Sequence, residues 1–337
     1  MNKKLFILVL ASLLSFANLS YASSNKEDQD TIEILNVSYD PTRELYQEYN
    51  QYFTKYWQKK TSQTVRINQL HGASSKQADL IIKGLEADVV TLALSYDIDL
   101  ISKKTDYFDD DWEHEFPHNS SPYTSTIVFL VKKDNPKNIK DWDDLTQKDL
   151  KIITQNPKAS GGARWSYMAV WAYADQKFSG DEKQIKNFLH NLYANVTNFD
   201  EGARQSTINF QNNKGDVLIT WENEALRIVK SSDKYKIITP SISIITEPPI
   251  AVVKKIAKEH ETYDVAEEYL EQLYSYEGQE IIAKNFYRSL NPTIIKKYHD
   301  QFPELTLVSI KQYGDWHKVQ KKHFAKGGIF DQLMAKK

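Results

Sequence analysis

The feature that most constrains this chain is a strand-to-helix turn with small residues at its centre. A β-branched run over residues 151–154 leads in, Ser160-Gly161-Gly162 forms the turn, and a helix-period apolar run begins at Trp165. Small side chains let another group approach the backbone closely. The first N–H groups of the helix that follows lack partners within it and lie at the positive end of its dipole. Such a turn can therefore bind an anion, although the glycine and lysine spacing of a P-loop is absent.

The arrangement recurs three more times along the chain. The strand predicted over residues 65–70 ends just before Ser74, which we expect to cap the next helix. The strand over residues 216–220 runs directly into Trp221, which is therefore expected at the edge of a cleft rather than in the core. A further helix begins at Ala203. Strands that alternate with helices predict an α/β fold whose sheets are mostly parallel. Because ligands bind beyond the carboxyl ends of such strands, the turns are expected to meet at one cleft.

Proline-containing segments divide the chain into two predicted lobes. Residues 115–123 and residues 240–249 each interrupt the alternation of strands and helices. We interpret them as crossings between the lobes. The chain length of 337 residues suits two domains. The predicted division gives a discontinuous first lobe over residues 31–123 and 250–337, and a second lobe over residues 124–249.

The N-terminal residues have the composition of a secretory signal peptide. Two lysines precede an apolar run over residues 5–16, and Ser20 and Ala22 place small residues at the −3 and −1 positions. The pattern predicts a signal peptide over residues 1–22 that is cleaved after Ala22. The apolar run is shorter than the ~20 residues that a membrane-spanning helix needs. We therefore expect an exported, periplasmic protein.

Composition excludes several function classes. Removing the predicted signal peptide removes two lysines and no acidic residue, so the formal net charge of −2 becomes −4. A mildly acidic chain argues against nucleic-acid binding, which depends on clustered lysine and arginine. The chain has no cysteine, which excludes a disulfide framework, thiol catalysis and a cysteine-held metal.

Motifs for catalysis are also missing. The chain has neither a Gly-x-Ser-x-Gly elbow nor a His-Glu-x-x-His zinc motif. His114 and His118 are four residues apart, but their segment is proline-broken and acidic. A solvated loop is the favoured interpretation there, with a zinc site as a minor alternative. Ser160 is a candidate nucleophile for which the sequence identifies no base. We predict no cofactor and no metal.

The candidate ligand groups at the recurring turns are neutral hydrogen-bond donors. They are the Ser74 hydroxyl, the backbone N–H groups around Ser160, Gly161, Gly162 and Ala203, and the indole of Trp221. An indole and a backbone N–H can donate but not accept. The set therefore suits an anion that carries no proton, such as sulfate, whereas hydrogen phosphate also requires an acceptor.

Several longer motifs resemble the periplasmic sulfate/thiosulfate-binding proteins of ABC importers. Three of them are Asn-Val-Ser-Tyr-Asp-Pro-Thr-Arg-Glu at 36–44, Pro-Lys-Ala-Ser-Gly-Gly-Ala-Arg-Trp at 157–165 and Trp-Glu-Asn-Glu-Ala at 221–225. Residues 123–129 and 278–280 show the same likeness. The resemblance extends from about residue 34 to the C-terminus.

This resemblance implies a two-lobed type II binding-protein fold that closes on a dehydrated sulfate. It implies as ligand donors Ser74, Ser160, Gly161, Gly162, Ala203 and Trp221, with Asp40 and Arg204 at helix starts behind them. One departure concerns the first turn. The family usually has Gly-Ser-Gly there, and this chain has Ala73-Ser74-Ser75, whose added Cβ atoms restrict the backbone.

The leading prediction is an exported, monomeric, non-enzymatic receptor. It delivers sulfate, with thiosulfate as a second candidate, to the membrane permease subunits of an ABC importer. Two alternatives stay open at this point. One is a receptor for another tetrahedral oxyanion, molybdate or phosphate, and the other is a hydrolase of sulfate or phosphate esters that uses Ser160.

Overall fold

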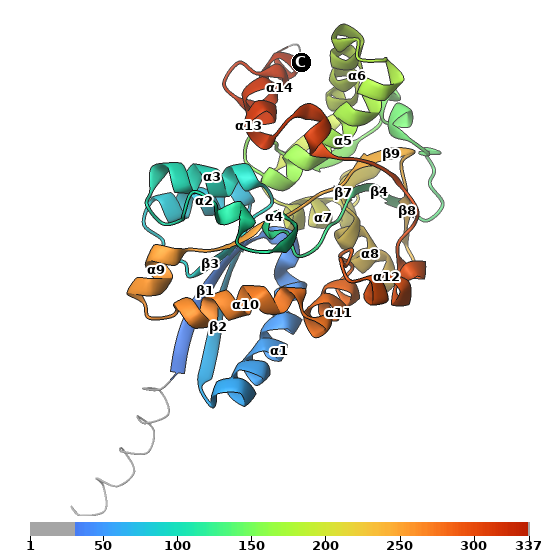
Figure 1. The fold of residues 1–337 in the computed structure, drawn as a ribbon. Coiled ribbons are helices and arrows are strands. Elements are labelled where there is room, and N and C mark those ends of the chain that lie inside the picture. The colour runs from blue at the N-terminus through green and yellow to red at the C-terminus, as the bar shows by residue number, and fades with distance from the viewer. Residues whose placement is uncertain (1–30, 336–337) are drawn as a thin grey trace, which may run out of the picture.

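Two larger sheets flanked by helices, with a small two-stranded sheet of β11 (Thr306–Val308) and β9 (Ile242–Ile244), make up the described part of the protein (Figure 1). The structure, a computed structural model, describes residues 31–335, and the predicted signal peptide lies outside them. No helix in this range is both long enough and apolar enough to cross a bilayer. The predicted α/β fold is confirmed.

The first sheet has the strand order β10-β3-β1-β2. Its strands are β1 (Thr31–Tyr39), β2 (Thr64–Gly72), β3 (Val89–Thr91) and β10 (Ile250–Val252). β1 is parallel to both β2 and β3, and β10 is added antiparallel. The helices α1 (Arg43–Thr61) and α2 (Ser74–Ile82) connect the three parallel strands. Parallel strands need such crossover helices, and here the crossovers leave the strands at the edge where the candidate site lies.

The second sheet has the strand order β6-β5-β7-β4-β8. Its strands are β4 (Ile127–Lys132), β5 (Ile152–Gln155), β6 (Val196–Asp200), β7 (Val217–Trp221) and β8 (Tyr235–Ile238). The flanking helices are α5 (Gly161–Lys177), α6 (Glu182–Ala194), α7 (Ala203–Gln211) and α8 (Glu222–Ser231). β5 is parallel to β6 and β7, whereas β4 is antiparallel to β7 and β8.

The remaining elements are short. They are α3 (Ser95–Lys104), α4 (Pro117–Ser120), α9 (Lys254–Glu259), α10 (Tyr263–Glu271), α11 (Tyr276–Lys284), α12 (Pro292–Lys297), α13 (Trp316–Val319), α14 (Ile329–Met334), β9 (Ile242–Ile244) and β11 (Thr306–Val308). The single turn α4 lies within the proline-containing segment 115–123, and His118, Asn119 and Ser120 have positive φ angles there.

The segments between the two sheets lie side by side. Ser125 pairs through its backbone with Thr246, and Thr124 pairs with Arg288. A third connection carries the chain through β11, which pairs with β9. Beyond it, α13 and α14 pack into the same core as α5 and α6, as the red and green helices of Figure 1 show. The predicted division into lobes stays a prediction, and residues 310–334 contact the elements of the second sheet.

A charged network joins α1 to α7 and α8. Glu44 on α1 accepts a hydrogen bond of 2.6 Å from Nη2 of Arg204, and Nε of Arg227 lies 3.5 Å from its other carboxylate oxygen. Glu224 lies one turn before Arg227 and is only 4% exposed. Burial raises the pKa of Glu224 to about 7, although Arg227 opposes the shift.

Stability should fall with rising pH because of Glu224. Well below pH 4.5, the ordinary pKa of a glutamate, the group is protonated in both the folded and the unfolded state and costs nothing. Between pH 4.5 and 7 the unfolded chain ionises first, which favours unfolding. The variant Glu224→Gln removes this cost. Its gain in unfolding free energy over the unmodified protein should grow from near zero at pH 4.5 to on the order of 3 kcal/mol at pH 8, measured by urea denaturation. The exposed Glu259→Gln is the control, and an equal gain at both pH values would contradict the account.

Candidate anion-binding site

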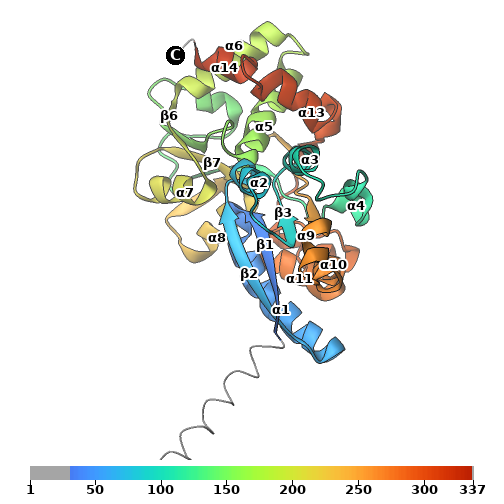
Figure 2. The same cartoon turned by 90° about the vertical axis from the view of Figure 1, so that its left-hand side faces the viewer.

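A small cavity of about 10 Å³ lies where strands of both sheets end. From the first sheet it is lined by Tyr39 and Gly72, the last residues of β1 and β2, together with Asp40, Pro41, Ala73 and Ser74. From the second it is lined by Gln155, the last residue of β5, together with Ser160, Gly162, Gly202 and Ala203. In Figure 2, α2 lies between the end of the first sheet and α5. The predicted convergence of strand-to-helix turns on one place is confirmed.

The glycine turn before α5 brings the two sheets into direct contact. Ser160 is the N-cap of α5, and its Oγ accepts a 3.3 Å hydrogen bond from the backbone N–H of Ala163. A Cβ added to Gly161 would lie 3.1 Å from the Cβ of Ser74, on the opposite side of the cavity. That distance is tighter than ordinary van der Waals contact. The absence of a side chain at this position therefore lets the turn approach α2.

The structure corrects the prediction for Ser74. The N-cap of α2 is Ala73, and Ser74 is the first helical residue. Its Oγ donates to Asp97 at 2.6 Å and accepts from the backbone N–H of Ala93 at 2.9 Å. Because neighbouring groups use the hydroxyl in this way, it cannot cap its own helix.

Asp97 and Arg164 are residues that the sequence reasoning missed. Asp97 lies in the first turn of α3, 1% exposed, and Arg164 lies in the first turn of α5. Nη1 of Arg164 lies 3.6 Å from Oδ1 of Asp97, which also accepts from Oγ of Ser75 at 3.1 Å. Burial raises the pKa of Asp97, and Arg164 is the main opposing influence. A signal was present in the sequence, because residues 88–94 form an apolar run typical of a buried strand and α3 begins directly after it, in the same arrangement as the other turns.

Trp221 is adjacent to the cavity and is fully buried. Its Nε1 donates to the carbonyl oxygen of Gly162 at 3.3 Å, and its ring centroid lies 5.3 Å from that of Tyr39. The expectation that Trp221 lies at the cleft edge rather than in the core is wrong, because its ring belongs to the core of the second sheet. Its N–H nevertheless reaches the glycine turn, where a Cβ on Gly162 would lie 3.1 Å from Nε1.

Asp40 and Arg204 connect two helix starts. Asp40 is the first residue of a short 3-10 turn after β1, and Tyr39 is the N-cap of that turn. Its Oδ2 accepts from the backbone N–H of Arg204 at 3.0 Å, and its Oδ1 accepts from Nε of Arg43 at 2.9 Å. The Asp40 carboxylate, which follows a strand of the first sheet, therefore pairs with a backbone N–H group in the first turn of α7, beside the second sheet.

The structure brings all eight predicted site residues into one region. Those that line the cavity are Asp40, Ser74, Ser160, Gly162 and Ala203. The other three contact lining residues: Gly161 lies against Ser74, Trp221 bonds to Gly162, and Arg204 bonds to Asp40. α2, α5 and α7 all begin here, so unpaired backbone donors and the positive ends of three dipoles meet at the cavity.

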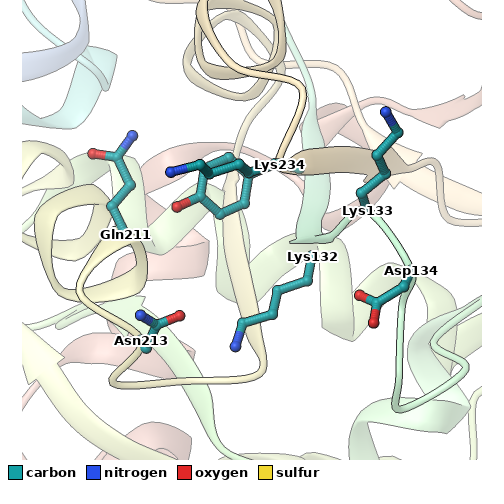
Figure 3. Close-up of a pocket in the computed structure, with 7 residues that line it drawn as sticks. Lys132, Lys133, Asp134, Gln211, Asn213 and Lys234 are labelled. Carbon is teal, nitrogen blue, oxygen red and sulfur yellow. The ribbon is translucent and has the colours of Figure 1, made fainter.

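A second hollow, of about 510 Å³, lies elsewhere on the second sheet (Figure 3). Three lysines surround it, Lys132, Lys133 and Lys234. Val131 pairs with Val217, the first residue of β7, so Lys132 lies at the opposite end of the sheet from Trp221. The three lysines are exposed, and an anion there would keep most of its water. This hollow is a weaker candidate.

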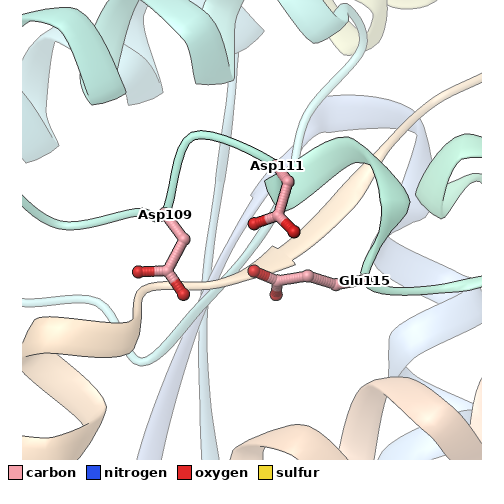
Figure 4. Close-up of side chains that lie close together, drawn as sticks. All are labelled: Asp109, Asp111 and Glu115. Atoms are coloured by element: carbon pink, nitrogen blue, oxygen red, sulfur yellow. The ribbon is translucent and has the colours of Figure 1, made fainter.

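Three carboxylates lie close together in Figure 4. Over residues 31–335, Asp109, Asp111 and Glu115 form the only group of three or more side chains suited to a metal. Nζ of Lys254 lies 2.6 Å from Asp109 and 2.7 Å from Glu115, so an ammonium group already compensates their charge. His114 and His118 do not belong to such a group, which gives the zinc alternative no support.

The comparisons with known proteins agree with this geometry. The sulfate-binding protein of Escherichia coli K12 is 52% identical over 90% of this chain and 93% of its own length. The thiosulfate-binding protein of Pseudomonas aeruginosa is 43% identical over 89% of this chain and 91% of its own length. The solved structure of the sulfate-binding protein SubI from Mycobacterium tuberculosis H37Rv matches with a TM-score of 0.78 and 27% identity, over 87% of this chain and 99% of that one.

The family profile described as bacterial extracellular solute-binding protein matches residues 38–288. That range includes every residue assigned to the site. The prediction of a binding receptor rather than an enzyme is confirmed. The chain belongs to the bacterial extracellular solute-binding protein family.

Proposed function

We propose that the protein is a receptor for sulfate, with thiosulfate as the second candidate, that serves an ABC importer. The observation that carries the proposal is the meeting of three helix N-termini at one small cavity that is lined mainly by neutral groups and, among the described residues, by no cation. The identity of 52% to a sulfate-binding protein supports it. Such a cavity offers hydrogen bonds to a dehydrated anion without a cation to bind it.

Each predicted ligand residue has a place in this proposal. The backbone N–H groups of Ser160, Gly161 and Gly162 at α5 and of Ala203 at α7 donate to the anion, as does the indole of Trp221. Ser74 joins them when its hydroxyl proton turns from Asp97 to the anion. The indole bond to the Gly162 carbonyl is 3.3 Å long, beyond the usual range, so a charged oxygen can replace that carbonyl as acceptor. Asp40 and Arg204 align the helix starts.

The two sheets form the cores of two lobes that close on the anion in this proposal. The connections at Ser125 and Thr246 act as the hinge, because their backbones pair between the sheets. The predicted signal peptide exports the chain to the periplasm. There the monomer delivers the anion to permease subunits in the membrane.

Two alternatives have less support. In the described residues, Ser160 uses its hydroxyl to cap α5, and no histidine lines the cavity, so the ester hydrolase has no base beside its nucleophile. A molybdate or phosphate receptor has the same fold. Hydrogen phosphate requires an acceptor, but both oxygens of the lining carboxylate Asp40 already accept from Arg204 and Arg43.

Sulfate should stabilise the folded protein by mass action. An anion that binds only the folded state at about 100 times its Kd contributes about 2.7 kcal/mol. We expect the Tm to rise by several degrees in millimolar sulfate and to stay constant in sodium chloride of equal ionic strength. Calorimetric titration should give a sulfate Kd that is constant between about pH 5 and 8. A Tm that is the same with and without millimolar sulfate would contradict the receptor proposal.

The substitution Trp221→Phe tests the indole donor. Phenylalanine keeps most of the ring and removes one charge-assisted hydrogen bond, which costs ~1.5–3 kcal/mol of binding. We expect about a tenfold to hundredfold weaker sulfate Kd by calorimetric titration.

The matched control for this test is Trp142→Phe. Trp142 is also fully buried, and its Nε1 donates to the carbonyl of Ile242, away from the cavity. It should lower the Tm and leave the sulfate Kd unchanged. If Trp221→Phe behaved like this control, the indole would be a core residue only.

A further inference from the structure

Gln155 places an unused amide at the cavity. It is the last residue of β5, is 1% exposed and lines the cavity. Its Nε2 is buried without a hydrogen-bond partner, and its side chain makes no hydrogen bond to another residue between 31 and 335. Buried polar groups are nearly always hydrogen-bonded, and each exception requires an explanation.

The amide lies among the proposed ligands of the anion. Oε1 of Gln155 is 3.6 Å from the point that a Cβ on Gly162 would occupy. Nε1 of Trp221 is 3.1 Å and Oγ of Ser160 is 3.6 Å from the same point. The three side chains therefore surround one small volume beside the glycine turn.

Either end of the amide can face this volume. A half-turn about the last side-chain bond exchanges Oε1 and Nε2, and that bond rotates softly. No hydrogen bond between residues holds the amide in one orientation. An anion would favour Nε2, because a donor is attracted to negative charge and the carbonyl oxygen is repelled.

Other unpartnered groups near the site do not share these properties. The side chain of Asn223 is unpartnered at both ends, but Asn223 does not line the cavity. Tyr39 lines the cavity, but its hydroxyl lies beside those of Tyr123 and Tyr287. Among the side chains that line the cavity, Gln155 is thus the one with a buried amide donor that has no hydrogen-bond partner.

We propose that Gln155 is a direct ligand of the bound oxyanion and donates to it through Nε2. The inference rests on the proposed function and adds a side-chain amide to the predicted donors. It also explains why a polar residue is tolerated unpaired at the end of a buried strand. The bound anion supplies the hydrogen-bond acceptor for Nε2 that no described residue provides.

The first test is Gln155→Met, which keeps the length of the side chain and removes the donor. The loss of one hydrogen bond to a charged group should weaken sulfate binding about tenfold to hundredfold, measured as the Kd by calorimetric titration. The Tm without sulfate should not fall, because no hydrogen bond within the protein is removed. An unchanged Kd would overturn the inference.

The second test uses pH as a readout that a packing role would not affect. In Gln155→Glu a carboxylate faces the anion at pH 8, so sulfate binding should weaken more than a hundredfold. As the pH falls and the carboxyl group is protonated, the affinity should recover towards that of the unmodified protein. Gln211→Glu is the matched control, since it adds the same charge at an exposed position, the last residue of α7.

The outcomes separate this inference from the proposed function. If the unmodified protein fails to bind sulfate or thiosulfate, the proposed function is wrong. If it binds and Gln155→Glu follows the same pH profile as Gln211→Glu, only the role of Gln155 is wrong. If sulfate affinity is lost at pH 8 and recovers at low pH in Gln155→Glu but not in Gln211→Glu, the result supports the direct contact.

Discussion

The rest of this structure depends on unpaired backbone N–H groups at the starts of α2, α5 and α7. A helix cannot satisfy its first donors internally, and here three helices direct them to one cavity. Burying such donors is costly unless an acceptor is present. Parallel strands explain the arrangement, because every crossover helix begins at the carboxyl edge of its sheet. An anion at that edge satisfies donors that the fold necessarily creates.

Contacts between the two sheets keep these helix starts together. Asp40 accepts from the backbone of Arg204, and Glu44 accepts from its guanidinium group. Asp97 makes a second contact of this kind, because its carboxylate lies near the guanidinium group of Arg164. It also accepts a hydrogen bond from the Ser74 hydroxyl. The three carboxylates lie on helices or turns beside the first sheet, and Arg164 and Arg204 lie on helices beside the second. The charges balance one another, and the cavity itself is lined mainly by neutral groups.

Local sequence reasoning was accurate for elements and less accurate for side-chain roles. The strand predicted before Ser74 and the helix start at Ala203 were both found. The expected roles of Ser74 as a cap and of Trp221 as an edge residue were wrong. In both cases a partner distant in the chain decides the outcome: Asp97 takes the Ser74 hydroxyl, and Tyr39 packs on the Trp221 ring. A periodic pattern contains no information about such partners.

The sequence by itself determined the α/β class, the strand-to-helix turns and the small residues at their centres. These follow from periodicity and from the steric freedom of glycine, which act over a few neighbouring residues. Only the tertiary structure decided that residues 310–334 pack beside α5 and α6, that Asp97 lies next to Arg164, and that the Gln155 amide is left without a partner. Those facts depend on the packing of segments from opposite ends of the chain, because a buried group's partner is set by distance in space and not by position in sequence.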